Sequence, residues 1–316
     1  MTAVNLDAVQ AALATVKDPE IHRPITDLGM VDNVDIDPNG HVTVAILLTI
    51  AGCPLQSSIR DSVISAVSRV EGVTAVDVTL GVMTDEQRRA MRQKLQGPGA
   101  QKDIPFNKPG NHTTVYAVTS GKGGVGKSST TVNLAATLAK RGFSVGILDA
   151  DIYGHSIPPM LGSTMPPTKV DDMMMPPEAH GVKCISIAQF TAGNAPVVWR
   201  GPMLHRALQQ FLTDVYWGDL DFLLLDLPPG TGDIALSIPS LLPNSQLLIV
   251  TTPQTAAAEV AERSGMMAAQ TKQKVVGVIE NMSWMELPDG STVEMFGNGG
   301  GMTVAMAVSY THLTLP

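Results

Sequence analysis

Cysteine is scarce in this sequence, whose 316 residues include only Cys53 and Cys184. Two cysteines exclude a disulfide-stapled framework and fit a reducing compartment. Basic residues are also few, with 21 Lys and Arg against 29 Asp and Glu, and the formal net charge is −8 at pH 7. Sequence-independent binding to nucleic acid depends on Lys and Arg that neutralise phosphates. The balance of charge therefore predicts no nucleic-acid partner.

Long apolar runs are missing as well. No stretch approaches the roughly 20 apolar residues that span a bilayer. The N-terminal segment carries Asp7 and has no basic stretch leading into an apolar run, so it does not resemble a secretory signal. We expect a cytoplasmic protein with no membrane partner. Hydrophobic residues make up 44% of the chain and charged residues 16%, which is the balance of a globular protein with a sizeable core.

The N-terminal part predicts a small α+β domain over residues 1–92. Apolar residues at helical spacing predict helices near residues 6–16 and 55–67, and alternation predicts strands at 42–49 and 73–80. Residues 93–112 are rich in Gly and Pro and lose this periodicity, so we expect an exposed linker there.

From residue 113 the pattern becomes strand, loop and helix, repeated. Several apolar runs are each followed by polar residues, and four of these runs end at Asp149, Asp226, Thr251 and Asn281. Such a pattern predicts an α/β domain over residues 113–307, with a mostly parallel sheet covered on both faces. Ligands of these folds bind beyond the carboxyl ends of the strands, where these polar residues are expected.

A phosphate-binding loop follows the first of these strands. The run GKGGVGKS fits G-x-x-x-x-G-K-[ST] in full, with a strand before it and a helix after it. Its glycines let backbone N–H groups surround phosphates, Lys127 supplies charge to the β and γ phosphates, and the Ser128 hydroxyl is a magnesium ligand. The predicted ATP site comprises Gly121, Lys122, Gly123, Gly124, Val125, Gly126, Lys127, Ser128 and Ser129.

Acidic residues at the strand ends complete the predicted site. Asp226 has the position of the aspartate that holds magnesium in P-loop proteins, and residues 228–233 form the next loop, a candidate γ-phosphate sensor. One of Asp149 and Asp151 is expected to join the magnesium network, and the other to orient the attacking water. Helix capping or a turn is the alternative role for either carboxylate.

Together these runs resemble the Mrp/ApbC family of iron–sulfur cluster carrier ATPases, within the MinD/ParA group. The matching segments are VTSGKGGVGKSSTTVNLA, ILDADIYGHSIPPMLG, WRGPML, LLLDLPPGTGD, TTPQ, GVIENMSW and FGNGGG, and the first domain resembles that of iron–sulfur assembly factors. The resemblance implies a homodimer that hydrolyses ATP with Mg²⁺ and passes clusters to apoproteins, together with assembly factors.

The resemblance also assigns roles to single residues. It makes Lys122 a second catalytic lysine beside Lys127, one that reaches the nucleotide across a dimer interface; a solvated loop lysine is the alternative. It favours Asp151 for the attacking water and Asp149 for magnesium. It places Asn281 where relatives read the adenine base, with an ordinary turn asparagine as the alternative.

The sequence departs from the family in one segment. Many members carry a C-x-x-C pair after N-M-S, whereas residues 284–290 here contain no cysteine. Because iron–sulfur clusters generally need thiolate ligands, the usual cluster site is missing. Cys53 precedes a predicted helix, whose N-terminus favours the thiolate, so it is a candidate iron–sulfur contact. Cys184 lies in a predicted buried strand and is expected to be an inert core thiol.

Two other functions stay open: a ParA/MinD-like positioning ATPase, and an ATP-ordered adapter that binds no cluster. Residues 308–316, VSYTHLTLP, do not continue the family pattern and resemble a translated sequencing adapter. We expect this tail to be non-native, and the family's C-terminal elements to be missing.

Overall fold

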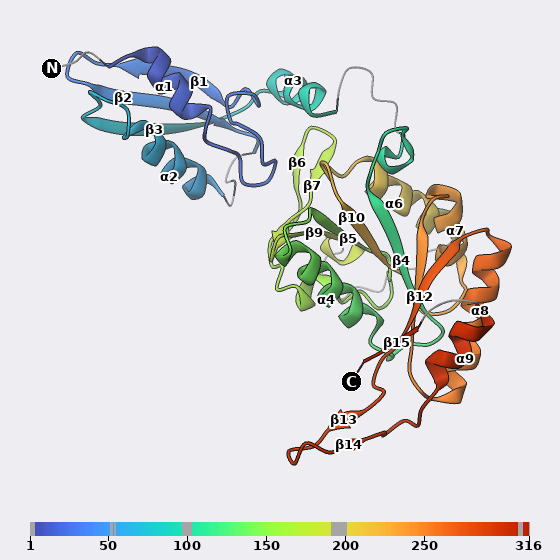
Figure 1. Cartoon of the computed structure of the whole chain (residues 1–316). Helices are drawn as coiled ribbons and strands as arrows, with labels where there is room; N and C mark the ends of the chain where they lie inside the picture. The colour runs from blue at the N-terminus through green and yellow to red at the C-terminus, as the bar shows by residue number, and fades with distance from the viewer. Residues whose placement is uncertain are drawn as a thin grey trace. The chain divides into compact units, whose positions relative to one another are not determined.

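The computed structural model describes residues 4–50, 53, 55–96, 103–190, 201–308 and 312–315. The chain divides into two compact units (Figure 1). The first comprises Met1–Gln101 together with Thr168–Met175, and the second comprises Lys102–Pro167 and Pro176–Pro316.

The first unit is built on a three-stranded sheet in the order β1-β2-β3, in which β1 and β2 are antiparallel and β2 and β3 are parallel. Its central strand alternates half-buried side chains with buried ones, because successive side chains of a strand point to opposite faces. Val42, Val44 and Ile46 are fully buried on one face. The elements are α1 (Leu6–Leu13), β1 (Val31–Ile36), β2 (His41–Leu48), α2 (Gln56–Val67), β3 (Ala75–Val82) and α3 (Asp85–Gln96).

The structure differs from the sequence-based expectation around the linker. Helix α3 continues to Gln96, four residues into the stretch expected to be irregular. Its sequence, DEQRRAMRQKLQ, consists of good helix formers but has little apolar periodicity, so the pattern hides the helix. Further on, Phe106 is buried in a short 3₁₀ turn, η1 (Pro105–Asn107), of the second unit.

A hairpin from the middle of the chain belongs to the first unit. It consists of β6 (Thr168–Val170) and β7 (Met173–Met175), which pair antiparallel. Met173 and Met175 are buried, so this methionine run is apolar filling. An ion pair joins Arg92 of α3 to Asp171 at 3.0 Å.

An eight-stranded sheet forms the centre of the second unit, in the order β15-β12-β11-β4-β10-β5-β9-β8. All neighbouring strands are parallel except β8 and β9. The strands are β4 (Thr114–Ser120), β5 (Val145–Asp149), β8 (Glu178–Ala179), β9 (Val182–Ser186), β10 (Phe222–Asp226), β11 (Gln246–Thr251), β12 (Lys274–Glu280) and β15 (His312–Thr314).

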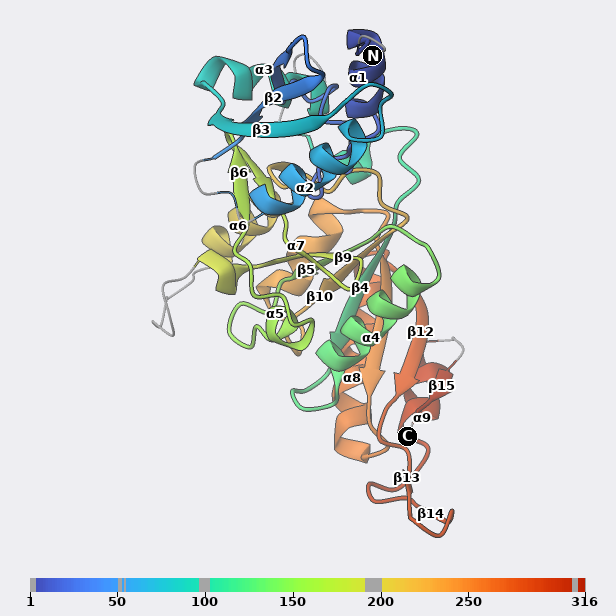
Figure 2. The same ribbon diagram turned by 90° about the vertical axis from the view of Figure 1, so that its left-hand side faces the viewer.

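Helices cover both faces of this sheet (Figures 1 and 2). The crossover from β4 to β5 runs one way along the strand order and that from β10 to β11 runs the other way, so right-handed connections place their helices on opposite faces. The helices α4 (Lys127–Lys140) and α5 (Ile157–Met160) cover one face. The other carries α6 (Gly201–Thr213), α7 (Asp233–Leu241), α8 (Thr255–Gln270) and α9 (Gly300–Ala307).

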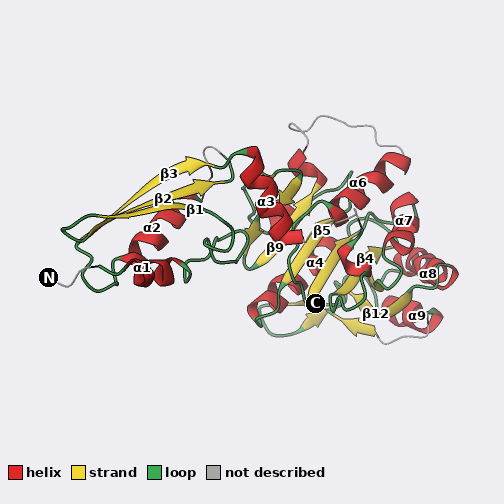
Figure 3. Ribbon diagram, turned by 90° about the horizontal axis from the view of Figure 1, so that it is seen from above, coloured by secondary structure: helices red, strands yellow, loops and turns green. Residues whose placement is uncertain are grey.

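The predicted fold class is confirmed: an α/β P-loop domain with a mostly parallel sheet follows a small α+β unit, as the strands and helices of Figure 3 show.

The expected non-native tail contributes β15, which pairs in parallel with β12 at the edge of the sheet. A small hairpin of β13 (Met285–Glu286) and β14 (Thr292–Val293) leaves the sheet after β12, and the turn η2 (Ile187–Phe190) follows β9. No helix in the described parts of the chain is both long and apolar enough to cross a membrane.

Candidate nucleotide-binding site

The phosphate-binding loop connects β4 to α4 at the centre of the sheet. It lies at the carboxyl end of β4, beside the point where the crossovers change direction, which is where open α/β sheets bind ligands. Gly124 and Gly126 have φ values of +79° and +85°, a left-handed conformation that favours glycine. Helix α4 begins directly after Gly126, so its N-terminus meets an anion held by the loop.

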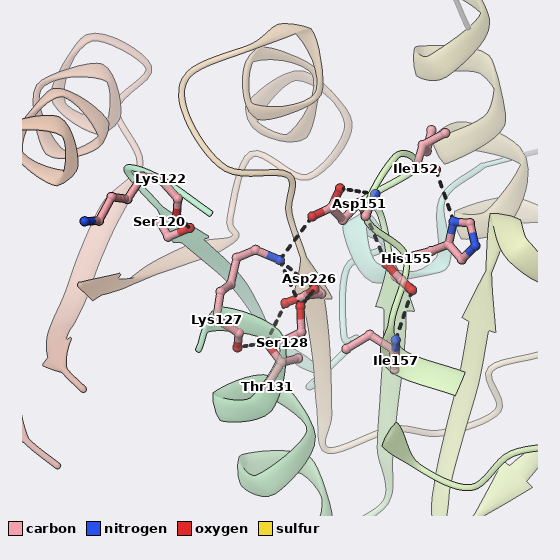
Figure 4. Close-up of polar contacts among 12 residues, drawn as sticks. Ser120, Lys122, Lys127, Ser128, Thr131, Asp151, Ile152, His155, Ile157 and Asp226 are labelled. Carbon is pink, nitrogen blue, oxygen red and sulfur yellow. Dashed lines mark hydrogen bonds and ion pairs between the residues drawn. The ribbon is translucent and has the colours of Figure 1, made fainter. Parts of the chain in front are cut away.

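Asp226, at the carboxyl end of β10, accepts hydrogen bonds from three side chains of α4 (Figure 4). Lys127 Nζ and Ser128 Oγ each donate a 2.6 Å hydrogen bond to Asp226 Oδ2, and Thr131 Oγ1 donates to Oδ1 at 2.8 Å. Asp226 is fully buried and Lys127 is 7% exposed. This geometry brings together the predicted charge donor, Lys127, and the predicted magnesium ligands, Ser128 and Asp226.

A second carboxylate, that of Asp151, also faces Lys127, with its Oδ2 3.6 Å from the ammonium nitrogen. The backbone N–H of Gly154 donates to the other carboxylate oxygen at 3.0 Å and fixes the side chain. Asp151 is buried and lines the pocket described below, so its carboxylate is placed where it can accept a bond from a ligand or a water.

Asp149, the last residue of β5, is more deeply buried than Asp151, with 1% of its surface exposed against 7%. Its Oδ2 accepts a hydrogen bond from Ser186 Oγ of β9 at 3.0 Å, and its Oδ1 accepts one from the Asp151 backbone at 3.2 Å. Burial, with the negative charge of Asp226 as a second cause, raises the pKa of Asp149 to about 7. The structure therefore separates the two aspartates: Asp151 faces Lys127, and Asp149 bonds Ser186 at the end of β9. The role of Asp149 in the magnesium network stays a prediction.

The second lysine of the loop lies apart from this cluster. Lys122 points away from Lys127 and Asp226 (Figure 4), and its ammonium donates a 2.5 Å hydrogen bond to Gln254 Oε1 at the start of α8. The contact is within one chain, and it holds the Lys122 amine at Gln254, away from Lys127.

A pocket of about 780 Å³ opens over the loop, which is large enough for a nucleotide. Polar groups of the loop and of the strand ends meet an apolar wall made by Met160 and Met282. The lining residues include Ser120, Lys122, Gly123, Gly124, Gly126, Lys127, Ser128, Ser129, Asp151, Tyr153, Gly154, Pro228, Pro229 and Met282. Pro228 and Pro229 belong to the predicted sensor loop.

The donors at this site fit magnesium. Ser128 Oγ and the Asp226 carboxylate are hard oxygen ligands, which Mg²⁺ prefers, and they lie 2.6 Å apart. In the described parts of the chain, no three His, Cys, Asp or Glu side chains converge as a self-contained metal site. Magnesium bound here would therefore need phosphate oxygens and waters as further ligands, as is usual for nucleotide sites.

Asn281, the predicted adenine reader, is attached to the phosphate-binding loop. Its side-chain Nδ2 donates a 3.0 Å hydrogen bond to the Val125 carbonyl oxygen. Its neighbour Met282 lines the pocket.

The cysteines are placed as follows. Cys184 is fully buried in β9, where burial raises its pKa, as expected of a core thiol. Cys53 is 6% exposed, and burial, assisted by the charges of Glu20 and Asp18, raises the pKa of its thiol. The expectation that a helix N-terminus favours the Cys53 thiolate is therefore wrong. The backbone N–H groups of Leu55 and Gln56 lower this pKa, but desolvation outweighs them.

Sequence reasoning missed four residues that complete the site. Thr131 bonds Asp226, Ser186 bonds Asp149, Gln254 bonds Lys122, and Met282 lines the pocket. The sequence held a signal for Thr131, which lies one helical turn after Lys127 and so shares its face. Ser186 ends β9 and Gln254 precedes α8, but the partners of both residues are set by the order of the strands in the sheet.

Family models match both parts of the chain. A model described as NUBPL iron-transfer P-loop NTPase matches residues 111–315, and one described as iron-sulfur cluster assembly protein matches residues 6–96.

Individual proteins match over most of the chain. The iron-sulfur cluster carrier protein of Mycobacterium tuberculosis is 63% identical over 302 residues, which cover 96% of this chain and 79% of the relative. That of Bacillus subtilis is 42% identical over 95% of this chain and 84% of its own length. A solved nucleotide-binding protein of Archaeoglobus fulgidus, in complex with ADP, is 36% identical, with a TM-score of 0.56 over 74% of this chain and 86% of its own.

Proposed function

The chain belongs to the iron-transfer P-loop NTPase family, and from this premise we propose that it binds and hydrolyses ATP and carries iron–sulfur clusters to apoproteins. The observation that carries the nucleotide part is the convergence of Lys127, Ser128 and Asp226 beside a pocket of about 780 Å³. The cluster part rests on relatives of high identity that are named iron-sulfur cluster carrier proteins.

The residues divide the work of hydrolysis among them. The loop glycines present backbone N–H groups to the phosphates, and Lys127 moves its charge from Asp226 to the β and γ phosphates. Ser128 and Asp226 would hold magnesium, which neutralises charge on the transferring phosphoryl group. Asp151, on the wall of the pocket, accepts a hydrogen bond from the attacking water and orients it.

We further propose that the active form is a homodimer. The Lys122 ammonium is bonded to Gln254 and points away from its own Lys127, so a single chain offers the transferring phosphate one lysine. A second copy would supply Lys122 to that phosphate, with the effect of an arginine finger.

The cargo site is the part in which this chain differs from the family pattern. The segment that contains β13 and β14 has no cysteine, and Cys184 is fully buried. Cys53 is therefore the candidate thiol ligand. Two copies contribute two such thiols, fewer than the four cysteines of a typical cluster, so the remaining ligands would come from a bound assembly factor or apoprotein.

Anaerobic reconstitution with iron and sulfide tests the carrier function. The ultraviolet–visible spectrum of the wild type should show cluster absorbance that Cys53→Ala loses and Cys184→Ala keeps. Transfer to an apoprotein should then follow. If the wild type takes up no cluster while it binds Mg–ATP, the carrier function is rejected and the nucleotide function stands.

The absence of the C-x-x-C pair favours one second candidate, an ATP-ordered adapter that recruits partners without holding a cluster. Single-turnover hydrolysis separates the two, with Lys127→Ala as the reference. An adapter should bind Mg–ATP but convert it no faster than this variant does.

A further inference from the structure

Asn281 is held between two strands and the phosphate-binding loop. It follows the last residue of β12, and its backbone N–H donates a 2.9 Å hydrogen bond to the Thr251 carbonyl at the end of β11. Its side chain turns to the loop, where Nδ2 donates to the Val125 carbonyl at 3.0 Å. Asn281 therefore connects the ends of two strands to the backbone of the loop.

The loop is shaped to receive this side chain. A Cβ atom at Gly126 would lie 2.2 Å from Asn281 Nδ2, so the amide occupies the space that any other residue at position 126 would fill. Gly126 has φ +85°, and the adjoining Val125 is buried. The amide thus contacts the Val125–Gly126 peptide in the turn that leads directly into Lys127.

The segment around Asn281 is itself well fixed. The next residue, Met282, has φ +60°, a left-handed conformation that a non-glycine residue adopts only when its surroundings impose it. Ser283 Oγ donates a 2.8 Å hydrogen bond to the buried carboxylate of Glu280. Because Glu280 and Met282, the residues on either side, are both constrained, Asn281 holds the loop from a well-fixed position at the end of β12.

We propose that Asn281 is a positioning residue for the phosphates, which acts through the loop backbone. This inference rests on the proposed nucleotide binding and adds a residue to that site. The amide nitrogen donates to Val125, so the contribution of this donor to affinity is made through the loop that surrounds the triphosphate. Without this donor, the backbone turn at Val125 and Gly126 is held less firmly. The loop N–H groups and Lys127 are then less well aligned with the phosphates.

A ligand without a base tests the proposal. The variant Asn281→Asp keeps the size of the side chain but replaces the donor with an oxygen that faces the Val125 carbonyl. Calorimetry should compare magnesium tripolyphosphate with Mg–ATP on the wild type, on Asn281→Asp and on Asn244→Asp, a matched change at an exposed turn. We expect Asn281→Asp to weaken both ligands by a similar factor of about tenfold or more, and Asn244→Asp to leave both unchanged.

Three results overturn the proposal in distinguishable ways. If Asn281→Asp weakens Mg–ATP but not tripolyphosphate, Asn281 reads the base. If it weakens neither, the contact with Val125 has no functional role. If the wild type binds neither ligand, the proposed nucleotide function fails as well. Thermal unfolding verifies that each variant is folded. Asn281→Ala is measured alongside, because the charge of Asn281→Asp could by itself weaken two anionic ligands. The proposal requires that Asn281→Ala, which adds no charge, also weakens both ligands by a similar factor; if it weakens neither, the effect of Asn281→Asp is repulsion by the new charge and the proposal fails.

Discussion

The ammonium of Lys127 lies 2.6 Å from Oδ2 of Asp226, and this contact joins the first turn of α4 to the end of β10. Both side chains are buried, and Asp226 has no exposed surface. The relationship makes the phosphate-binding lysine a structural counter-ion as well as a ligand-binding group.

Replacement of Lys127 should therefore affect stability as well as binding. Lys127→Ala leaves the buried Asp226 carboxylate without its counter-ion, and breaking such a pair costs about 3–5 kcal/mol. We expect a lower unfolding temperature in nucleotide-free buffer and no measurable Mg–ATP binding by calorimetry. Lys140→Ala, at the exposed end of the same helix, is the matched control. An unfolding temperature equal to that of the wild type would contradict the structural role.

A mixing experiment tests whether Lys122 acts across a dimer. Lys122→Ala should bind Mg–ATP nearly as well as the wild type, because its ammonium points away from Lys127, but it should hydrolyse little. Lys127→Ala should hydrolyse nothing. An equal mixture should regain roughly one quarter of wild-type activity, since half the dimers are mixed and each has one complete site. A mixture that stays as inactive as its components argues that Lys122 acts within its own chain.

Two glycines of the loop should respond differently to alanine. A Cβ atom on Gly121 would lie 2.4 Å from the Ala261 backbone nitrogen of α8, whereas one on Gly123 would meet nothing within 4 Å. Gly121→Ala should therefore lower the free energy of unfolding by about 1–3 kcal/mol. Gly123→Ala should stay within about 1 kcal/mol of the wild type. Chemical denaturation without nucleotide measures both. Equal effects of the two variants would show that the close approach of Gly121 to α8 is unimportant.

The stability of the protein should depend on the protonation of Asp149. Burial and the charge of Asp226 raise its pKa from 3.8 to about 7, so between these values the folded protein keeps a proton that the unfolded chain has released. The contribution of this group to the free energy of unfolding is therefore full below about pH 4, falls as the pH rises, and is lost above about pH 7.

Denaturation of the wild type and of Asp149→Asn at several pH values, with a chelator present, measures this dependence. The variant should show a shallower decline between pH 4 and pH 7, while Asp18 and Glu20, whose pKa values burial also raises, keep their own contribution. Asp32→Asn, which removes an exposed carboxylate of β1, should keep the full decline. Parallel pH profiles for all three proteins would be evidence against a protonated Asp149.

Alkylation rates test the environment of Cys53. Because burial and the charges of Glu20 and Asp18 raise its pKa, iodoacetamide at pH 7 should modify it more slowly than free cysteine. Glu20→Gln removes one of these charges and should speed the reaction about two- to threefold. Cys53→Ala gives the background from the buried Cys184. Modification of the wild type faster than free cysteine would mean that the thiolate is favoured after all.

The sequence by itself determined which secondary-structure elements form the site. Gly, Lys and Ser at fixed spacing between an apolar strand and an amphipathic helix are local features, and they predicted the loop, the helix after it and the parallel sheet. The strand that ends at Asp226 was equally predictable from the sequence, since its apolar run is continuous. Helix α3 was missed altogether, because its helix propensity is strong but its apolar periodicity is weak.

Only the tertiary structure decided which polar groups meet. Asp149 and Asp151 are two residues apart and chemically identical, yet Asp151 faces Lys127 while Asp149 bonds Ser186. Gln254 reaches Lys122 across 132 positions, and Asn281 reaches Val125 across 156. The raised pKa of Cys53 likewise comes from burial, not from its place before a helix. Such pairings depend on the order of strands in the sheet, which brings distant strand ends together, and local sequence does not encode that proximity.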